Sequence, residues 1–163
     1  MRFSLIALTA LLSFSGCSQK GAFDLFKMDK AQERAIEELR IGTIVMSFET
    51  KAIFSSLYLN KINPETYNGG EYFIASFYFA NDNRLIKQLN IEDYGYHLTL
   101  NGKSPTLVEP LSETDLRRRL MPIRNDWNRY YLIRFDPVPE SALTLRLENN
   151  QTGSVVLNYQ KEN

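Results

Sequence analysis

The feature that most constrains the fold is an alternation of apolar and polar residues with a period of two, which starts at Thr43 and recurs to the end of the chain. It is clearest over residues 143–148, which read Leu-Thr-Leu-Arg-Leu-Glu. Successive side chains of a strand point to opposite faces, so this spacing buries one face and exposes the other. The pattern predicts that the chain beyond residue 43 is a series of β-strands.

A first β segment is expected to run from residue 43 toward an Asn-Pro break at residues 63–64. Ile44, Met46 and Phe48 share one face of it at the spacing of a strand. We therefore expect these three side chains to point into the core. The apolar alternation continues beyond them toward the break.

The segment from Glu71 to Ala80 is almost continuously apolar or aromatic, and Ser76 is the one polar residue after its first position. A strand that is covered on both faces has this composition, because neither face needs polar side chains. We expect a strand in the middle of a sheet, with layers packed on both sides of it.

The dipeptide Asn101-Gly102 follows an alternating run, and it suits the positive backbone angles of a two-residue hairpin turn. We expect a hairpin whose return strand covers residues 103–108. Pro105 lies in that strand and has no N–H to donate to a neighbour. The return strand is therefore predicted to lie at the edge of a sheet.

Further strands are expected around residues 131–135, 143–147 and 155–159, with a hairpin at residues 149–153 between the last two. About eight short strands separated by turns favour an antiparallel β-sandwich of the immunoglobulin-like kind over residues 43–160. A small β-barrel is the alternative. The class is mostly β.

An amphipathic helix is predicted over residues 25–40, because apolar side chains recur there at helical spacing and charged ones occupy the opposite side. Gly42 is expected to end this helix with a left-handed cap. Since acidic and basic residues are mixed on the polar side, packing against the domain is favoured over contact with lipid.

The first 16 residues contain one basic residue, a short apolar run from Phe3 to Phe14, and the small pair Ser15-Gly16 before the single cysteine, Cys17. These parts are typical of a secretory signal peptide. The run is shorter than the roughly 20 apolar residues of a membrane span.

The segment Phe14-Ser15-Gly16-Cys17 resembles the lipobox of bacterial lipoproteins. The resemblance implies a diacylglycerol on the Cys17 sulfur, cleavage before Cys17, and acylation of the new amino terminus. Residues 17–24 would then be a lipidated tether. An ordinary signal peptide with a free thiol, or a membrane-spanning helix, are the alternatives.

Lipidation implies a membrane-anchored protein of the cell envelope. In well-studied envelopes an aspartate after the lipidated cysteine keeps lipoproteins at the inner membrane, and this chain has Ser18 at that position. The outer membrane is therefore the expected location. One cysteine cannot form a disulfide within the chain, so packing must stabilise the domain.

The chain holds 19 basic and 19 acidic residues, and this balance argues against nucleic acid as a partner. The charges are unevenly placed, however. Residues 117–134 contain six of the eleven arginines and one acid, Asp126. A short helix is expected at their start, with Ser112 capping it and Asp115 completing a capping box.

Arginine forks onto carboxylate and phosphate oxygens and stacks on aromatic rings, and aromatic residues are interleaved with arginines in this segment. We predict a binding patch formed by Arg117, Arg118, Arg119, Arg124, Trp127, Arg129 and Tyr130. Lipid phosphates, peptidoglycan carboxylates and acidic protein surfaces are candidate partners. The alternative is that these arginines only form a solvated surface.

The residues offer little for catalysis. His97 is the only histidine, which excludes the common zinc sets, and no serine lies in the setting of a nucleophile. We expect no metal, no cofactor and no enzymatic activity. The expected function is a membrane-anchored binding or adapter module, and an assembly factor or inhibitor of another envelope protein is the alternative.

Overall fold

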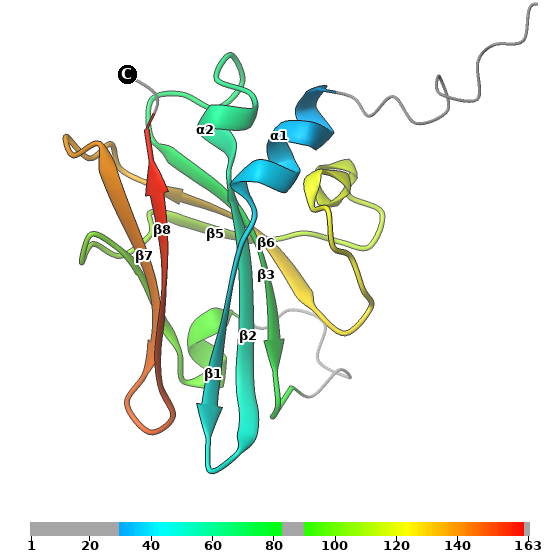
Figure 1. The fold of residues 1–163 in the computed structure, drawn as a ribbon, viewed down its shortest axis with the longest axis vertical. Coiled ribbons are helices and arrows are strands. Elements are labelled where there is room, and N and C mark those ends of the chain that lie inside the picture. Colours follow the sequence, from blue (N-terminus) through cyan, green and yellow to red (C-terminus); the bar gives the residue numbers. More distant parts are fainter. Residues whose placement is uncertain (1–29, 83–89, 162–163) are drawn as a thin grey trace, which may run out of the picture.

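The computed structural model describes residues 30–82 and 90–161, and Figure 1 shows their fold. The predicted signal peptide (1–16), the tether with Cys17 and the first five residues of the predicted helix lie outside the described residues. None of the described helices is long and apolar enough to cross a membrane.

The described strands form two antiparallel sheets that pack face to face, so the domain is mostly β and is built as a two-layer sandwich (Figure 1). The larger sheet has the spatial order β1 (Arg40–Met46), β2 (Glu49–Tyr58), β3 (Glu71–Phe79), β6 (Arg129–Phe135) and β5 (Leu107–Pro110). The smaller sheet has the order β4 (His97–Leu100), β7 (Ala142–Asn149) and β8 (Gly153–Gln160).

The main core lies between the two sheets and is rich in aromatic rings. Phe54 of β2 stacks on Phe77 of β3 with ring centroids 4.7 Å apart. Phe79 stacks on Tyr94 at 4.3 Å, and Tyr94 ends the short 3₁₀ helix η2 (Ile91–Tyr94). The alternating leucines of β7 complete this core from the smaller sheet, as their spacing predicts.

A second apolar cluster covers part of the outer face of the larger sheet. It lies under α1 (Lys30–Glu38), α2 (Leu59–Ile62) and the 3₁₀ helix η3 (Leu116–Leu120). Ile74 of β3 is buried in this cluster while its neighbour Phe73 is buried in the main core. The prediction of a central strand that is covered on both sides is therefore confirmed for β3.

Gly42 does not cap a helix, so that prediction is wrong. The helix ends at Glu38, and the guanidinium of Arg40 donates to the carbonyls of Glu37 and Leu39 at its end, at 2.6 and 3.1 Å. Gly42 lies in β1, where a Cβ would be 2.2 Å from Cγ2 of Val155 on β8. Glycine is needed there because the edges of the two sheets approach each other closely.

The first predicted β segment is divided by a hairpin turn that the sequence pattern did not indicate. Ser47 and Phe48 form a two-residue turn between β1 and β2, and Met46 pairs with Glu49 across it. Met46 and Phe48 are exposed, so the expectation that both point into the core is wrong. The segment also stops being a strand at Leu59, which begins α2.

The turn predicted at Asn101-Gly102 is confirmed, with φ angles of 46° and 81°. The return strand differs from the prediction. After Lys103 the chain crosses to the larger sheet, where β5 pairs with β6 at its edge, and Pro105 lies outside any strand. The predicted hairpin at residues 149–153 joins β7 and β8.

Candidate functional site

The short helix η3 starts later than predicted, and its cap is a different residue. The carboxylate of Asp115 accepts from the backbone N–H of Arg117 at 2.8 Å, and Asp115 is the N-cap. The hydroxyl of Ser112 lies 3.2 Å from that of Thr114 and caps nothing. Because the helix is a 3₁₀ turn that begins at Leu116, the capping position moves to Asp115.

Arg117 is held between two carboxylates. Its guanidinium donates to both oxygens of Glu109 on β5, at 2.6 and 3.1 Å, and to Asp115 at 2.6 Å. Hydrogen bonds to Asp115 and Glu109 raise the pKa of Arg117, and Arg117 in turn lowers the pKa of Asp115. The charge of Arg117 is thus used inside the domain, where it joins β5 to η3.

Arg129 is engaged in the same way at the other end of the segment. Its guanidinium forks onto the carboxylate of Asp82, at 2.9 Å from Nε and 2.7 Å from Nη2. The hydroxyl of Tyr94 donates to the same carboxylate at 2.6 Å. The two charged side chains are only 15% and 11% exposed, so this is a largely buried ion pair that joins β6 to the turn that follows β3.

Tyr130 is buried and organises the loop after η3. Its hydroxyl accepts from the backbone N–H of Asn125 at 3.0 Å and donates to the carbonyl of the same residue at 3.2 Å. The guanidinium of Arg118 lies over the Tyr130 ring, 4.1 Å from its centroid. Stacking on a fixed ring limits the orientations of Arg118 and leaves its N–H groups available.

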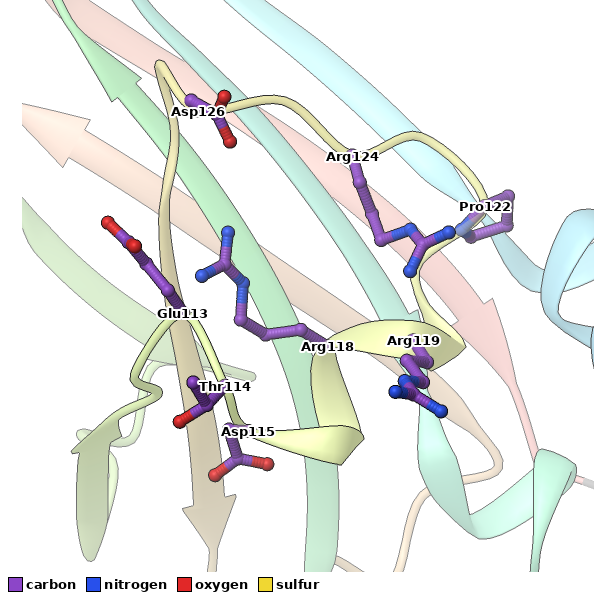
Figure 2. Close-up of a pocket in the computed structure, with 8 residues that line it drawn as sticks. All are labelled: Glu113, Thr114, Asp115, Arg118, Arg119, Pro122, Arg124 and Asp126. Atoms are coloured by element: carbon purple, nitrogen blue, oxygen red, sulfur yellow. The ribbon is translucent and has the colours of Figure 1, made fainter.

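The remaining arginines of the predicted patch surround a hollow of about 480 Å³, which we call the η3 hollow. Figure 2 shows that its arginines come from η3 and from the loop after it, and that its acids come from the loops on either side. It is lined by Glu113, Thr114, Asp115, Arg118, Arg119, Pro122, Arg124 and Asp126.

Within the described ranges 30–82 and 90–161, Arg118, Arg119 and Arg124 form no ion pair with a carboxylate. Glu113 and Asp126, on the rim of the same hollow, are also unpaired there. Ion pairs therefore separate the predicted patch into Arg117 and Arg129, which are engaged, and three arginines with free donors.

The sequence overestimated the positive charge of this region. Residues 117–134 hold one acid, but the fold brings Asp82, Glu109, Glu113 and Asp115 to the same arginines. The η3 hollow consequently has mixed charge. The acids that line it just before η3 could have been found from the capping pattern, whereas Asp82 lies 47 residues before Arg129 and gives no local signal.

Trp127, which follows Asp126 of the hollow in the chain, is 65% exposed, and its backbone N–H donates to Oδ1 of Asn125 at 3.0 Å. Leu116, the first residue of η3, and Ile123, in the loop after η3, are also exposed, at 66% and 52%. Exposed apolar and aromatic side chains thus belong to the same segment of chain as the arginines that line the hollow.

His97 has an exposed side chain on β4 and lies in the other sheet from the η3 hollow. In the part of the chain that the structure describes, no group of three or more His, Cys, Asp or Glu residues is placed to hold a metal ion. Comparisons with protein families, with curated proteins and with solved structures found no match.

Proposed function

We propose that this protein is a lipid-anchored, non-enzymatic binding module of the bacterial cell envelope, and that the η3 hollow holds anionic groups of another envelope component. The observation that supports the binding site is that three arginines around one hollow form no ion pair with any carboxylate of the described residues. Guanidinium groups bind carboxylate or phosphate oxygens with charge-assisted hydrogen bonds, each worth about 1.5–3 kcal/mol.

The hollow is organised before any ligand arrives. Arg118 is oriented by the ring of Tyr130, whose hydroxyl is itself fixed by two hydrogen bonds to Asn125. Less conformational entropy is lost on binding when the donor is already held in place. Arg118 is therefore the residue that we expect to contribute most to affinity.

The acids on the rim define the class of ligand. Glu113 and Asp126 repel a dense polyanion, but they attract a ligand that carries amino groups beside its carboxylates. A peptide or a protein surface with both charges fits this pattern better than a polyphosphate does. Peptidoglycan stem peptides and acidic patches of envelope proteins are of this class.

The anchor that we propose is the lipid on Cys17, at the outer membrane because Ser18 follows it. The twelve residues 18–29 separate Cys17 from the start of α1. At 3.3–3.6 Å per residue they reach at most roughly 43 Å. Confinement to such a layer raises the effective concentration of the domain toward partners near the same membrane.

We also propose that the sandwich is immunoglobulin-like. Two antiparallel sheets share one core, and the connections β3 to β4, β4 to β5 and β6 to β7 pass from one sheet to the other. Such crossing connections are typical of that architecture. A solved crystal structure with strands in this order and these crossovers would support the assignment.

The binding site is tested with the triple variant Arg118→Ser, Arg119→Ser and Arg124→Ser in the full chain. The control is Arg146→Ser, which removes a half-exposed arginine from β7 in the other sheet. We expect the triple variant to lose the envelope neighbours that crosslinking in intact cells and mass spectrometry identify, and the control to keep them. An unchanged set of neighbours would overturn the proposed site.

The anchor is tested separately by metabolic labelling with a fatty acid. The wild-type chain should carry the label, and Cys17→Ser should lose it and leave the membrane fraction. A Cys17→Ser variant that stays labelled and membrane-bound would rule out the thioether anchor without affecting the proposal for the η3 hollow.

A further inference from the structure

The turn between β1 and β2 is built from residues that its backbone does not suit. Ser47 and Phe48 have φ angles of 54° and 65°, and Met46 pairs with Glu49 on either side of them. A two-residue hairpin turn with both φ angles positive favours Asn and Gly. In Phe48 the Cβ atom is crowded by the following carbonyl, which makes this conformation unfavourable.

The Phe48 side chain is not buried, so no packing energy offsets the cost of its positive φ angle. Phe48 is completely exposed, at 105% of its reference area, and is the most exposed large apolar residue of the described chain. The adjacent Val45 and Met46 are 57% and 39% exposed. The tip of the hairpin is thus an apolar projection, which we call the Phe48 tip and define as Val45, Met46, Ser47 and Phe48.

The charges beside the Phe48 tip indicate what kind of surface it meets. Glu49 and Lys51, the nearest charged residues in the strand, form an ion pair with each other. The pair leaves no net positive charge to attract the phosphates of a lipid surface. A single ring on a narrow turn has the convex shape that enters a pocket, and aromatic residues, Phe among them, are enriched at protein interfaces.

The Phe48 tip also lies at the far end of the molecule from the start of the described chain. In Figure 1, α1 is at the upper end and the β1–β2 turn is at the lower end. A chain that is anchored through its amino terminus would therefore carry the tip on the side away from the anchor.

We propose that the Phe48 tip is a docking site for another protein and that the Phe48 ring enters an apolar pocket of that partner. The unfavourable turn is explained if it serves to direct the Phe48 side chain outward from the tip of the hairpin. The proposal does not depend on the η3 hollow. Together the two sites would make the domain an adapter with one contact at each end.

The test begins with p-benzoylphenylalanine in place of Phe48 in the full chain, which is irradiated in intact cells. Mass spectrometry then identifies the adduct and the residues that are joined. We expect an adduct with one other protein, at residues that line an apolar pocket. An adduct with lipid, an adduct between two copies of this chain, or the absence of any adduct overturns the proposal.

The partner identified in this way is purified, and its affinity for the variants is measured by calorimetry. Ser47→Asn with Phe48→Gly gives the turn its preferred residues, so this double variant should melt at a higher temperature than the wild type, and misfolding cannot explain a loss of binding. We expect its affinity to fall at least tenfold.

Two control variants isolate the ring. Ser47→Asn alone improves the turn but keeps Phe48, and Leu107→Ala removes an exposed apolar side chain from β5 at the opposite edge of the sheet. Both should bind the partner within twofold of the wild type. Equal affinity of the double variant and the wild type would show that Phe48 makes no contact of importance.

Discussion

The molecule contains the same kind of turn twice, once with residues that suit it and once with residues that do not. Asn101-Gly102 and Ser47-Phe48 both join paired positions through two residues with positive φ. Asn101 is also bound to the neighbouring strand β7, since its side chain accepts from the N–H of Thr144 at 2.7 Å. The Phe48 tip projects into solvent instead.

The difference between these turns separates the requirements of folding from those of recognition. At Asn101-Gly102 the local preference, the turn geometry and the contacts with β7 all agree, as expected of residues that stabilise a fold. At Ser47-Phe48 the positive φ angle and the full exposure of the ring are both unfavourable for a phenylalanine at position 48. Such disagreement is typical of positions that are kept for function.

The largest effect on stability is expected when Ser and Phe, the residues of the Phe48 turn, are placed in the Asn101-Gly102 turn. The variant is Asn101→Ser with Gly102→Phe. The variant loses the hydrogen bonds of the Asn101 side chain to Thr144 and Ala142. These contribute about 1 kcal/mol each, and Phe in a left-handed conformation costs a further ~1–2 kcal/mol. Urea unfolding should show a loss of about 3–4 kcal/mol in the free energy of unfolding. A loss below about 1 kcal/mol in the free energy of unfolding would contradict the statement that Asn101 and Gly102 stabilise the fold.

The reverse exchange, Ser47→Asn with Phe48→Gly, should stabilise the domain by about 1–2 kcal/mol. No buried contact is lost, because Phe48 is fully exposed. Thermal unfolding should shift upward by roughly 2–4 °C per kcal/mol for a domain of this size. Phe48→Ala is the control, since it removes the ring but keeps a Cβ at positive φ, and it should leave the melting temperature nearly unchanged.

A smaller effect is expected for Gly102→Ala. The φ angle of Gly102 is 81°, and a Cβ added there would have nothing within 4 Å. The cost is therefore conformational alone, about 1 kcal/mol. Gly42→Ala is the contrasting variant, because there the added Cβ collides with Val155 at an ordinary φ angle. If Gly102→Ala were neutral in denaturant unfolding, backbone preference could not explain the difference between the turns.

The smallest effect concerns Glu49, which follows Phe48. A hydrogen bond and the charge of Lys51 lower the pKa of Glu49 below its ordinary value of 4.5. A carboxyl whose pKa is lowered in the folded state stabilises that state above pH 4.5, and this contribution is lost as the pH falls through the lowered pKa. An NMR titration should show the shift in the wild type and its disappearance in Lys51→Met. An ordinary pKa for Glu49 in the wild type would mean that Glu49 and Lys51 do not form their ion pair in solution.

The contrast between the turns also explains which parts of the fold the sequence predicted. Asn101-Gly102 was found because its residues are those the backbone prefers. Ser47-Phe48 was missed because neither Ser nor Phe is typical of a turn with two positive φ angles, and the apolar alternation continued through it. The length of the predicted segment was the available signal, since a strand from residue 43 to beyond residue 57 is far longer than the usual 5–6 residues.

At the candidate site, the sequence likewise predicted only part of the charge arrangement. The arginines were identified from the sequence, but their partners were not. Arg117 is neutralised by Glu109 and Asp115, and Arg129 by Asp82, which follows the turn after β3. Ion pairs between distant segments depend on strand order, and strand order is a property of the whole fold. Counting charges along a segment therefore overstates what a partner meets.

The strand that carries the exposed ring has a further consequence. β1 spans the seven residues from Arg40 to Met46, between the end of α1 and the turn. At about 3.4 Å per residue, the length of β1 sets a distance of roughly 24 Å between the helix and the turn that carries the ring. Two extra residues in each of β1 and β2 would lengthen the hairpin by about 7 Å and keep every side chain on its own face of the sheet. One extra residue in each would turn the ring to the opposite side, so the reach of the domain is adjustable only in steps of two.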